Sequence, residues 1–120
     1  MKFKNMFSPI QIGPMTVKNR FVVPPMGNNF ANSDGTWSDE SVAYYGERAK
    51  GQFGLITIEA TVVHKGAKGG PKKPCLYDDN SIESLKKITD ACHEEGAKVS
   101  IQLQNAGPEG NAKNAGAPIQ

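Results

Sequence analysis

The sequence has few cysteines, no long apolar run and no excess of charge of one sign. Its two cysteines, Cys75 and Cys92, lie far apart and form no CxxC pattern. We expect reduced thiols in a cytoplasmic protein, because small disulfide-stabilised scaffolds are much richer in cysteine. No apolar run approaches the roughly 20 residues of a transmembrane helix. The first residues also lack the apolar segment of a secretion signal, so neither is predicted.

Charge and length exclude further classes of protein. Lysine and arginine number 14 and aspartate and glutamate 12, which gives a net charge of +2. A protein that binds nucleic acid or an anionic membrane usually has a stronger basic excess, so neither partner is expected. Hydrophobic residues make up 38% and charged residues 22%, as in a globular domain, and 120 residues allow one domain.

The hydrophobic pattern predicts a short hairpin followed by three strands and two helices. Apolar and polar residues alternate around Gly13-Pro14, which is typical of a hairpin. The expected strands are 21–23, 54–60 and 99–103, and the expected helices are 39–50 and 81–95. The first strand is a continuous apolar run, so we expect it to be buried on both faces.

Each predicted helix has one apolar face and a recognisable end. Ser38 is suited to cap the first helix and Gly51 to end it. The expected apolar positions are Val42, Tyr45 and Ala49 in the first helix, and Ile82, Leu85, Ile88 and Cys92 in the second. Between them, residues 61–80 form a long expected loop. Its lysines, Lys65, Lys68, Lys72 and Lys73, are expected to be solvated.

The order strand, helix, strand, helix, strand implies a parallel sheet and an α/β fold. Two architectures fit it: half of a doubly wound sheet, or the first three units of a (β/α)8 barrel. A complete barrel needs eight strands and about 250 residues. Three strands and two helices leave apolar surface uncovered, so we expect the chain to be a piece of a larger protein.

Parallel α/β folds place their sites at the carboxyl ends of the strands. There, Pro25-Met26-Gly27 offers an apolar wall, Ala60 leaves room for a flat ring, and Gln102 carries both a hydrogen-bond donor and an acceptor. Such a surface suits a planar heterocycle such as an isoalloxazine, although ordinary core packing at strand ends fits the same pattern. Glu59 is expected to orient a neighbouring loop.

Four segments carry a resemblance to a known family. They are 19–27 (NRFVVPPMG), 39–51 (DESVAYYGERAKG), 54–63 (GLITIEATVV) and 93–103 (HEEGAKVSIQL). Together they resemble the Old Yellow Enzyme family, the NADH:flavin oxidoreductases, over essentially the whole chain. The form Pro-Pro-Met-Gly-x-Asn is most similar to the bacterial branch with enoate reductases and 2,4-dienoyl-CoA reductases.

The resemblance implies a fold, a reaction and a set of site residues. Residues 1–120 would be the N-terminal portion of an FMN-binding (β/α)8 TIM barrel, an incomplete barrel of three strands and two helices after a hairpin. The enzyme would pass hydride from NAD(P)H through FMN to an activated alkene, a small α,β-unsaturated molecule. The residues implied at the flavin are Pro24, Pro25, Met26 and Gly27 along the ring, Ala60 near its polar edge, and Gln102 at its pyrimidine part.

The resemblance also implies what this chain lacks. Many members follow the third strand with a His and a Gly-Arg, where this chain has Asn105 and Gly107-Pro108, so a fixed cation is missing. The catalytic proton donor and the phosphate-binding loops are expected beyond residue 120, so this chain alone should bind FMN weakly. Cys75 and Cys92 do not match an iron–sulfur pattern, and such a cluster would belong only to a longer parent protein.

Other interpretations remain open at this point. The chain could be a non-catalytic remnant of the same ancestry, or a half-barrel that a partner chain completes. It could also be a different α/β barrel enzyme that takes another ligand, such as a phosphosugar. The protein partner would be another copy of the chain or the missing C-terminal portion of the barrel.

Overall fold

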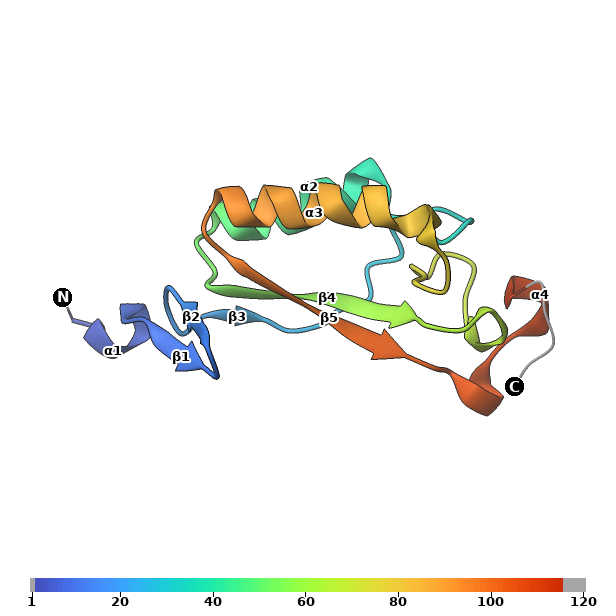
Figure 1. The fold of residues 1–120 in the computed structure, drawn as a ribbon, viewed down its shortest axis with the longest axis horizontal. Helices are drawn as coiled ribbons and strands as arrows, with labels where there is room; N and C mark the ends of the chain where they lie inside the picture. Colours follow the sequence, from blue (N-terminus) through green and yellow to red (C-terminus); the bar gives the residue numbers. More distant parts are fainter. Residues whose placement is uncertain (1, 116–120) are drawn as a thin grey trace.

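The computed structural model describes residues 2–115 and contains a three-stranded parallel sheet that two helices cover on one face (Figure 1). The strands lie in the order β3 (Val22–Val23), β4 (Leu55–Val62) and β5 (Lys98–Gln104). Helices α2 (Asp39–Lys50) and α3 (Ile82–Glu94) pack against each other above the sheet. The predicted alternation of parallel strands and helices is therefore confirmed.

A separate antiparallel hairpin precedes the sheet. Strand β1 (Ile10–Ile12) pairs with β2 (Met15–Val17), and Gly13 adopts a positive φ of 56° in the turn between them. Glycine suits this turn because it has no Cβ to clash in that conformation. The hairpin is thus confirmed, and a short helix that the pattern did not predict, α1 (Lys4–Phe7), precedes it.

Helix α2 begins and ends where the sequence predicts. The Ser38 hydroxyl accepts a hydrogen bond from the backbone N–H of Ser41 at 3.2 Å, and Gly51 follows the last helical residue. Such a cap satisfies a backbone donor that has no partner within the helix. Tyr45 and Ala49 are buried, so the predicted apolar face packs on the sheet.

The core lies between the helices and the sheet, and strand β4 crosses its centre. A buried strand of this kind is apolar on the face that the helices cover. The buried core residues are Val23, Trp37, Tyr45, Ala49, Ile56, Ile58, Ile88, Cys92 and Ala97. Cys92 in this core and Cys75 outside it are both buried and free.

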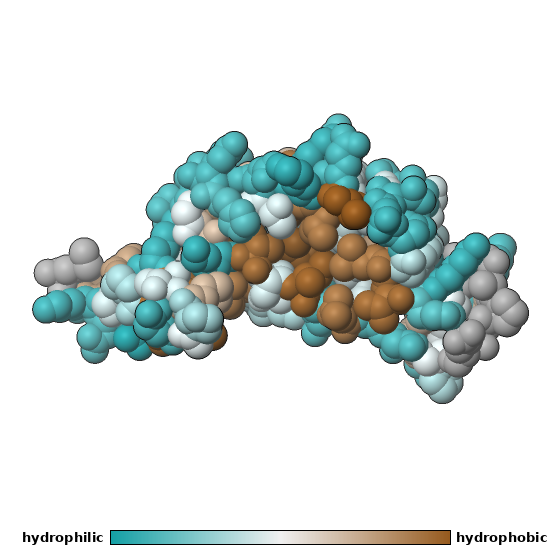
Figure 2. All heavy atoms as spheres, viewed as in Figure 1, coloured by the Kyte–Doolittle hydropathy of each residue, from teal (hydrophilic) through white to brown (hydrophobic). Residues whose placement is uncertain are grey.

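Two burial predictions are wrong. Val22 was expected to be buried but is 47% exposed, because no helix covers its face of the sheet within residues 2–115. Ile82 was expected in the apolar face of α3 but is 58% exposed, at the first residue of that helix. Figure 2 shows an apolar surface in brown on one side of the molecule. Leu85 of α3 and Val99 and Ile101 of β5 line a shallow pocket between these two elements.

The connections contain short helical turns that the sequence pattern did not predict. They are the 3-10 turns η1 (Lys65–Ala67), η2 (Asp79–Ser81) and η3 (Gly107–Glu109), and the helix α4 (Ala112–Ala115). Within residues 2–115, no helix combines the length and the apolar character needed to cross a bilayer.

Two glycines give a matched test of the packing. A Cβ on Gly54 would lie 2.7 Å from both Asn19 Oδ1 and Val17 Cγ1, whereas a Cβ on Gly46 would lie 3.8 Å from its nearest neighbour. We expect Gly54→Ala to lower the free energy of unfolding by about 1–3 kcal/mol, the usual cost of overpacking. Gly46→Ala, inside α2, should raise it by about 0.5–1 kcal/mol. Urea unfolding measures both, and equal effects of the two variants would contradict this packing.

Candidate functional site

The carboxyl ends of β4 and β5 bring Ala60 and Gln102 together. Ile58 pairs with Ile101 and Thr61 with Leu103, so two residues of β4, at 59 and 60, lie opposite Gln102 alone. This irregularity has the form of a β-bulge, which turns side chains out of the regular alternation and often lies next to a binding site. Gln102 is exposed, so its amide is free to meet a ligand.

The segment after β3 reaches the same edge of the sheet. Pro24, Pro25, Met26 and Gly27 follow β3 directly, and Met26 is 44% exposed. The next backbone N–H, that of Asn28, donates a hydrogen bond to Glu59 Oε2 at 3.2 Å. Because Glu59 precedes Ala60, this bond ties the segment to β4. All six residues predicted for the site therefore lie at one edge of the sheet.

Glu59 is a fully buried carboxyl group at the centre of this edge. Its backbone N–H donates to the Tyr45 hydroxyl at 3.0 Å, and its Oε2 accepts from Asn28. Its Oε1 is buried and has no hydrogen-bond partner among residues 2–115. Burial raises the pKa of Glu59, while the Asn28 hydrogen bond and the charge of Lys73 act to lower it. The contact with Asn28 agrees with the predicted role of Glu59 in orienting a loop.

The lysine-rich loop after β4 differs from its prediction. Lys65 and Lys72 are exposed as expected, but Lys68 is buried and its Nζ donates to the Ser33 carbonyl at 2.9 Å. Lys73 is half-buried, and its Nζ lies 3.2 Å from the point where a Cβ on Gly27 would stand. The predicted solvation of Lys68 and Lys73 is wrong because a lysine's charge does not show which backbone and side-chain groups the folded loop brings next to it.

A backbone contact draws this loop towards the segment after β3. Cys75 N donates to the Gly35 carbonyl at 2.9 Å, and Cys75 also forms an isolated parallel bridge with Val62 at the end of β4. The loop is thereby held against residues that lie far away in the sequence. No local motif signals such a contact, so the positions of Lys68 and Lys73 could not be read from their neighbours.

Asn105 stabilises the turn that follows β5. Its Oδ1 accepts a hydrogen bond from Gly107 N at 2.9 Å, and Gly107 has a positive φ of 51°. Asparagine commonly stabilises turns in this way. Asn105 therefore helps to shape the turn that follows β5.

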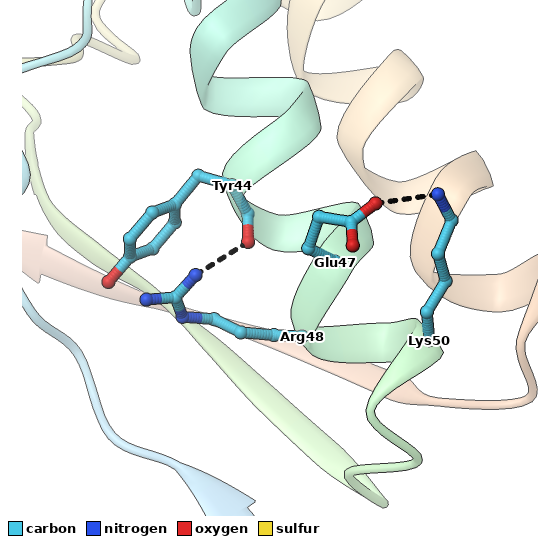
Figure 3. A network of polar contacts seen from close by, with 4 residues as sticks. All are labelled: Tyr44, Glu47, Arg48 and Lys50. Carbon is cyan, nitrogen blue, oxygen red and sulfur yellow. Dashed lines mark hydrogen bonds and ion pairs between the residues drawn. The ribbon is translucent and has the colours of Figure 1, made fainter.

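Polar contacts on α2 form a network outside the site (Figure 3). Arg48 Nη1 donates to the Tyr44 carbonyl at 2.8 Å, and the guanidinium lies 3.2 Å from the centre of the Tyr44 ring. Glu47 and Lys50 form an exposed ion pair at 2.6 Å. These contacts join residues of the same helix, so the cation of Arg48 serves the surface of α2. In the described part of the chain, no group of acidic, His and Cys side chains could hold a metal ion.

The site residues fit a planar ring with a polar edge. Met26 offers exposed apolar surface, and Gly27 beside it is also exposed, although Lys73 Nζ lies 3.2 Å from the point where its Cβ would stand. Ala60 adds little bulk at the bulge, and the exposed Gln102 amide can both donate and accept a hydrogen bond. This set of groups suits the isoalloxazine of FMN.

Comparisons with known proteins agree with this geometry. A family model for the NADH:flavin oxidoreductase / NADH oxidase family matches residues 5–118. An Old Yellow Enzyme structure from a Pichia species is 34% identical, with a TM-score of 0.88, and the match covers 96% of this chain and 31% of that one. A 2-naphthoyl-CoA reductase in complex with 2-naphthoyl-CoA is 33% identical over 94% of this chain and 17% of its own, with a TM-score of 0.88.

A third structure extends the agreement. The Old Yellow Enzyme homologue from Zymomonas mobilis is 31% identical over 93% of this chain and 31% of its own, with a TM-score of 0.86. The chain thus spans less than a third of the length of each of these three proteins. Of the two architectures that fit the sequence, these likenesses support the barrel. The hairpin, three strands and two helices form an incomplete (β/α)8 barrel.

The hydrogen bond from the Glu59 backbone N–H to the Tyr45 hydroxyl can be tested by removing that hydroxyl group. Tyr45→Phe would leave the buried N–H of Glu59 without its acceptor, which costs about 1–3 kcal/mol of unfolding free energy. Tyr44→Phe is the matched control, because it keeps the ring that stacks on Arg48 and should change stability little. Urea unfolding of both variants measures the difference, and equal losses would contradict the assigned bond.

The buried carboxyl of Glu59 predicts a pH dependence of stability. Because burial raises its pKa above the ordinary 4.5, the folded chain holds this proton more tightly than the unfolded chain. The contribution is present below that ordinary value and is lost as pH rises through the raised pKa. The side chain in Glu59→Gln cannot ionise. The free energy of unfolding of the wild type, relative to that of this variant, should therefore fall as the pH rises from the ordinary pKa of a glutamate through the raised pKa of Glu59. The exposed control Glu94→Gln should follow the wild type, and parallel curves for Glu59→Gln would contradict the assignment.

Proposed function

The chain belongs to the NADH:flavin oxidoreductase / NADH oxidase family, and we propose that it carries part of the flavin site of an ene-reductase. Enzymes of this family are FMN-dependent NAD(P)H oxidoreductases. In this proposal, residues 1–120 are the N-terminal portion of an FMN-binding barrel domain. The observation that carries the proposal is the meeting of Met26, Ala60 and Gln102 at one edge of the sheet.

Each residue has a distinct part in holding FMN. Pro24, Pro25, Met26 and Gly27 would line the ring and keep water from it, and Ala60 would lie near its polar edge. Gln102 would hydrogen-bond the pyrimidine part of the ring through its amide. When bound, FMN accepts hydride from NAD(P)H and supplies it to the substrate. Hydrogen bonds from fixed protein donors stabilise the negative charge that the ring gains.

The proposed substrate is a small molecule with an activated, α,β-unsaturated bond. One solved relative is a 2-naphthoyl-CoA reductase in complex with 2-naphthoyl-CoA, and another is a morphinone reductase. The catalytic residues and the phosphate-binding loops are proposed to lie outside residues 1–120. We propose a cytoplasmic location, where NAD(P)H is available as the hydride donor.

The test uses the 120-residue chain, labelled with 15N and titrated with FMN. We expect the amide signals of Gly27, Ala60 and Gln102 to shift, and we expect weak binding because the phosphate-binding loops are proposed to lie elsewhere. Gln102→Leu should raise the dissociation constant by about 2–10-fold, the loss of one hydrogen bond. Gln11→Leu in the hairpin is the matched control and should leave binding unchanged. Shifts confined to other residues would overturn the site, and tight binding would contradict the missing phosphate anchor.

A second measurement separates an enzyme from a non-catalytic remnant. With saturating FMN and NADH under anaerobic conditions, an active protein should bleach the flavin and turn over an activated alkene. The 120-residue chain alone should show no turnover, because the catalytic residues are proposed to lie outside it. A protein with the whole barrel that binds flavin without reducing it would favour the remnant, and activity that needs a second chain would favour the half-barrel completed by a partner.

A further inference from the structure

Glu59 is the one fully buried acidic side chain among residues 2–115, and it lies at the proposed flavin edge. Its Oε1 has no hydrogen-bond partner in that part of the chain. A buried polar atom without a partner is costly, so such a group commonly serves a purpose beyond packing. The side-chain amide nitrogen of Asn28, which follows the flavin-lining segment, is also buried without a partner in the same region.

Two opposite charges border the backbone of Gly27. A Cβ on Gly27 would stand 3.8 Å from Glu59 Oε2 and 3.2 Å from Lys73 Nζ. The carboxyl group of β4 and the ammonium group of the following loop therefore both lie close to the point where a side chain on Gly27 would begin. The next residue, Asn28, donates its backbone N–H to that carboxyl group at 3.2 Å. Glu59 therefore contacts residues 27–28 directly.

Three elements face the carboxyl group, and only one contributes a charge. Lys73, from the loop after β4, brings a cation that favours the ionised form of Glu59. Tyr45, from α2, stays neutral because burial raises the pKa of its hydroxyl. Asn28, from the segment after β3, is a neutral donor. Lys73 is therefore the charge that opposes the effect of burial.

We propose that Glu59 is a positioning residue whose ionised carboxylate, with Lys73 as its partner charge, holds residues 27–28 in the flavin-binding position. Protonation replaces a charge-assisted hydrogen bond to Asn28 with a neutral one, which is roughly half as strong. Residues 27–28 are then held less firmly at the sheet edge, and the position of the adjacent apolar residues Pro25 and Met26 becomes more variable. This inference rests on the proposed flavin site, but the bond to Asn28 exists without a ligand.

The test follows the backbone amide of Asn28 by NMR as the pH of the 15N-labelled 120-residue chain is changed. Between about pH 4 and about pH 9, its proton signal should move downfield as Glu59 ionises. Glu59→Gln should abolish this movement. Lys73→Met should raise the midpoint, because the cation that favours the carboxylate is gone. Lys72→Met, at the exposed neighbouring position, is the matched control and should leave the midpoint unchanged.

The outcomes separate this inference from the proposed function. An Asn28 signal that does not titrate, or a midpoint that Lys73→Met and Lys72→Met change equally, would overturn the inference whether or not FMN binds. These lysine variants leave the carboxyl group intact, so the comparison stands even if Glu59→Gln fails to fold. Conversely, an Asn28 titration that depends on Lys73 with no FMN-induced shift would support the positioning role and overturn the flavin site. If both hold, FMN should bind several-fold more tightly above the midpoint, and Glu59→Gln should lose that pH dependence.

Discussion

Burial of strand β4 beneath two helices is the interaction on which the rest of the structure depends. Ile56 and Ile58 are fully buried under α2 and α3, and β4 hydrogen-bonds to β3 on one side and β5 on the other. Its neighbours are therefore aligned in parallel, and their carboxyl ends meet at one edge. Every residue of the candidate site owes its place to that alignment.

The two faces of the sheet have different chemistry. The face under the helices is apolar, whereas the opposite face carries a hydrogen bond of 2.8 Å between the hydroxyls of Thr57 and Ser100 and the exposed Val22. In a (β/α)8 barrel this second face belongs to the interior, which side chains from other strands fill. The exposure of Val22, which the sequence pattern did not predict, follows from the incomplete barrel.

The features that could be predicted from the sequence are those with a local cause. Ser38 caps α2 because its hydroxyl accepts a hydrogen bond from a backbone N–H three residues away, and Gly13 marks a turn because glycine adopts a positive φ without strain. The positions of Ala60 and Gln102 follow from strand order, which helical and strand periodicity indicate. Boundaries were less certain: β4 runs two residues beyond its expected end because Val62 gains partners in the folded loop.

The polar groups behind the site have a different origin. Lys73 lies 14 residues after Glu59 in the chain, and nothing in the spacing shows that the two border one glycine. Their proximity depends on the loop after β4, which returns to the segment after β3. The backbone N–H of Cys75 there donates a hydrogen bond to the Gly35 carbonyl. Strand order can therefore indicate which residues gather at this edge of the sheet, but the cation beside Gly27 comes from a loop, and its position emerges only in the folded chain. A buried carboxyl group beside a glycine is costly in isolation, and the cation from the loop offsets part of that cost.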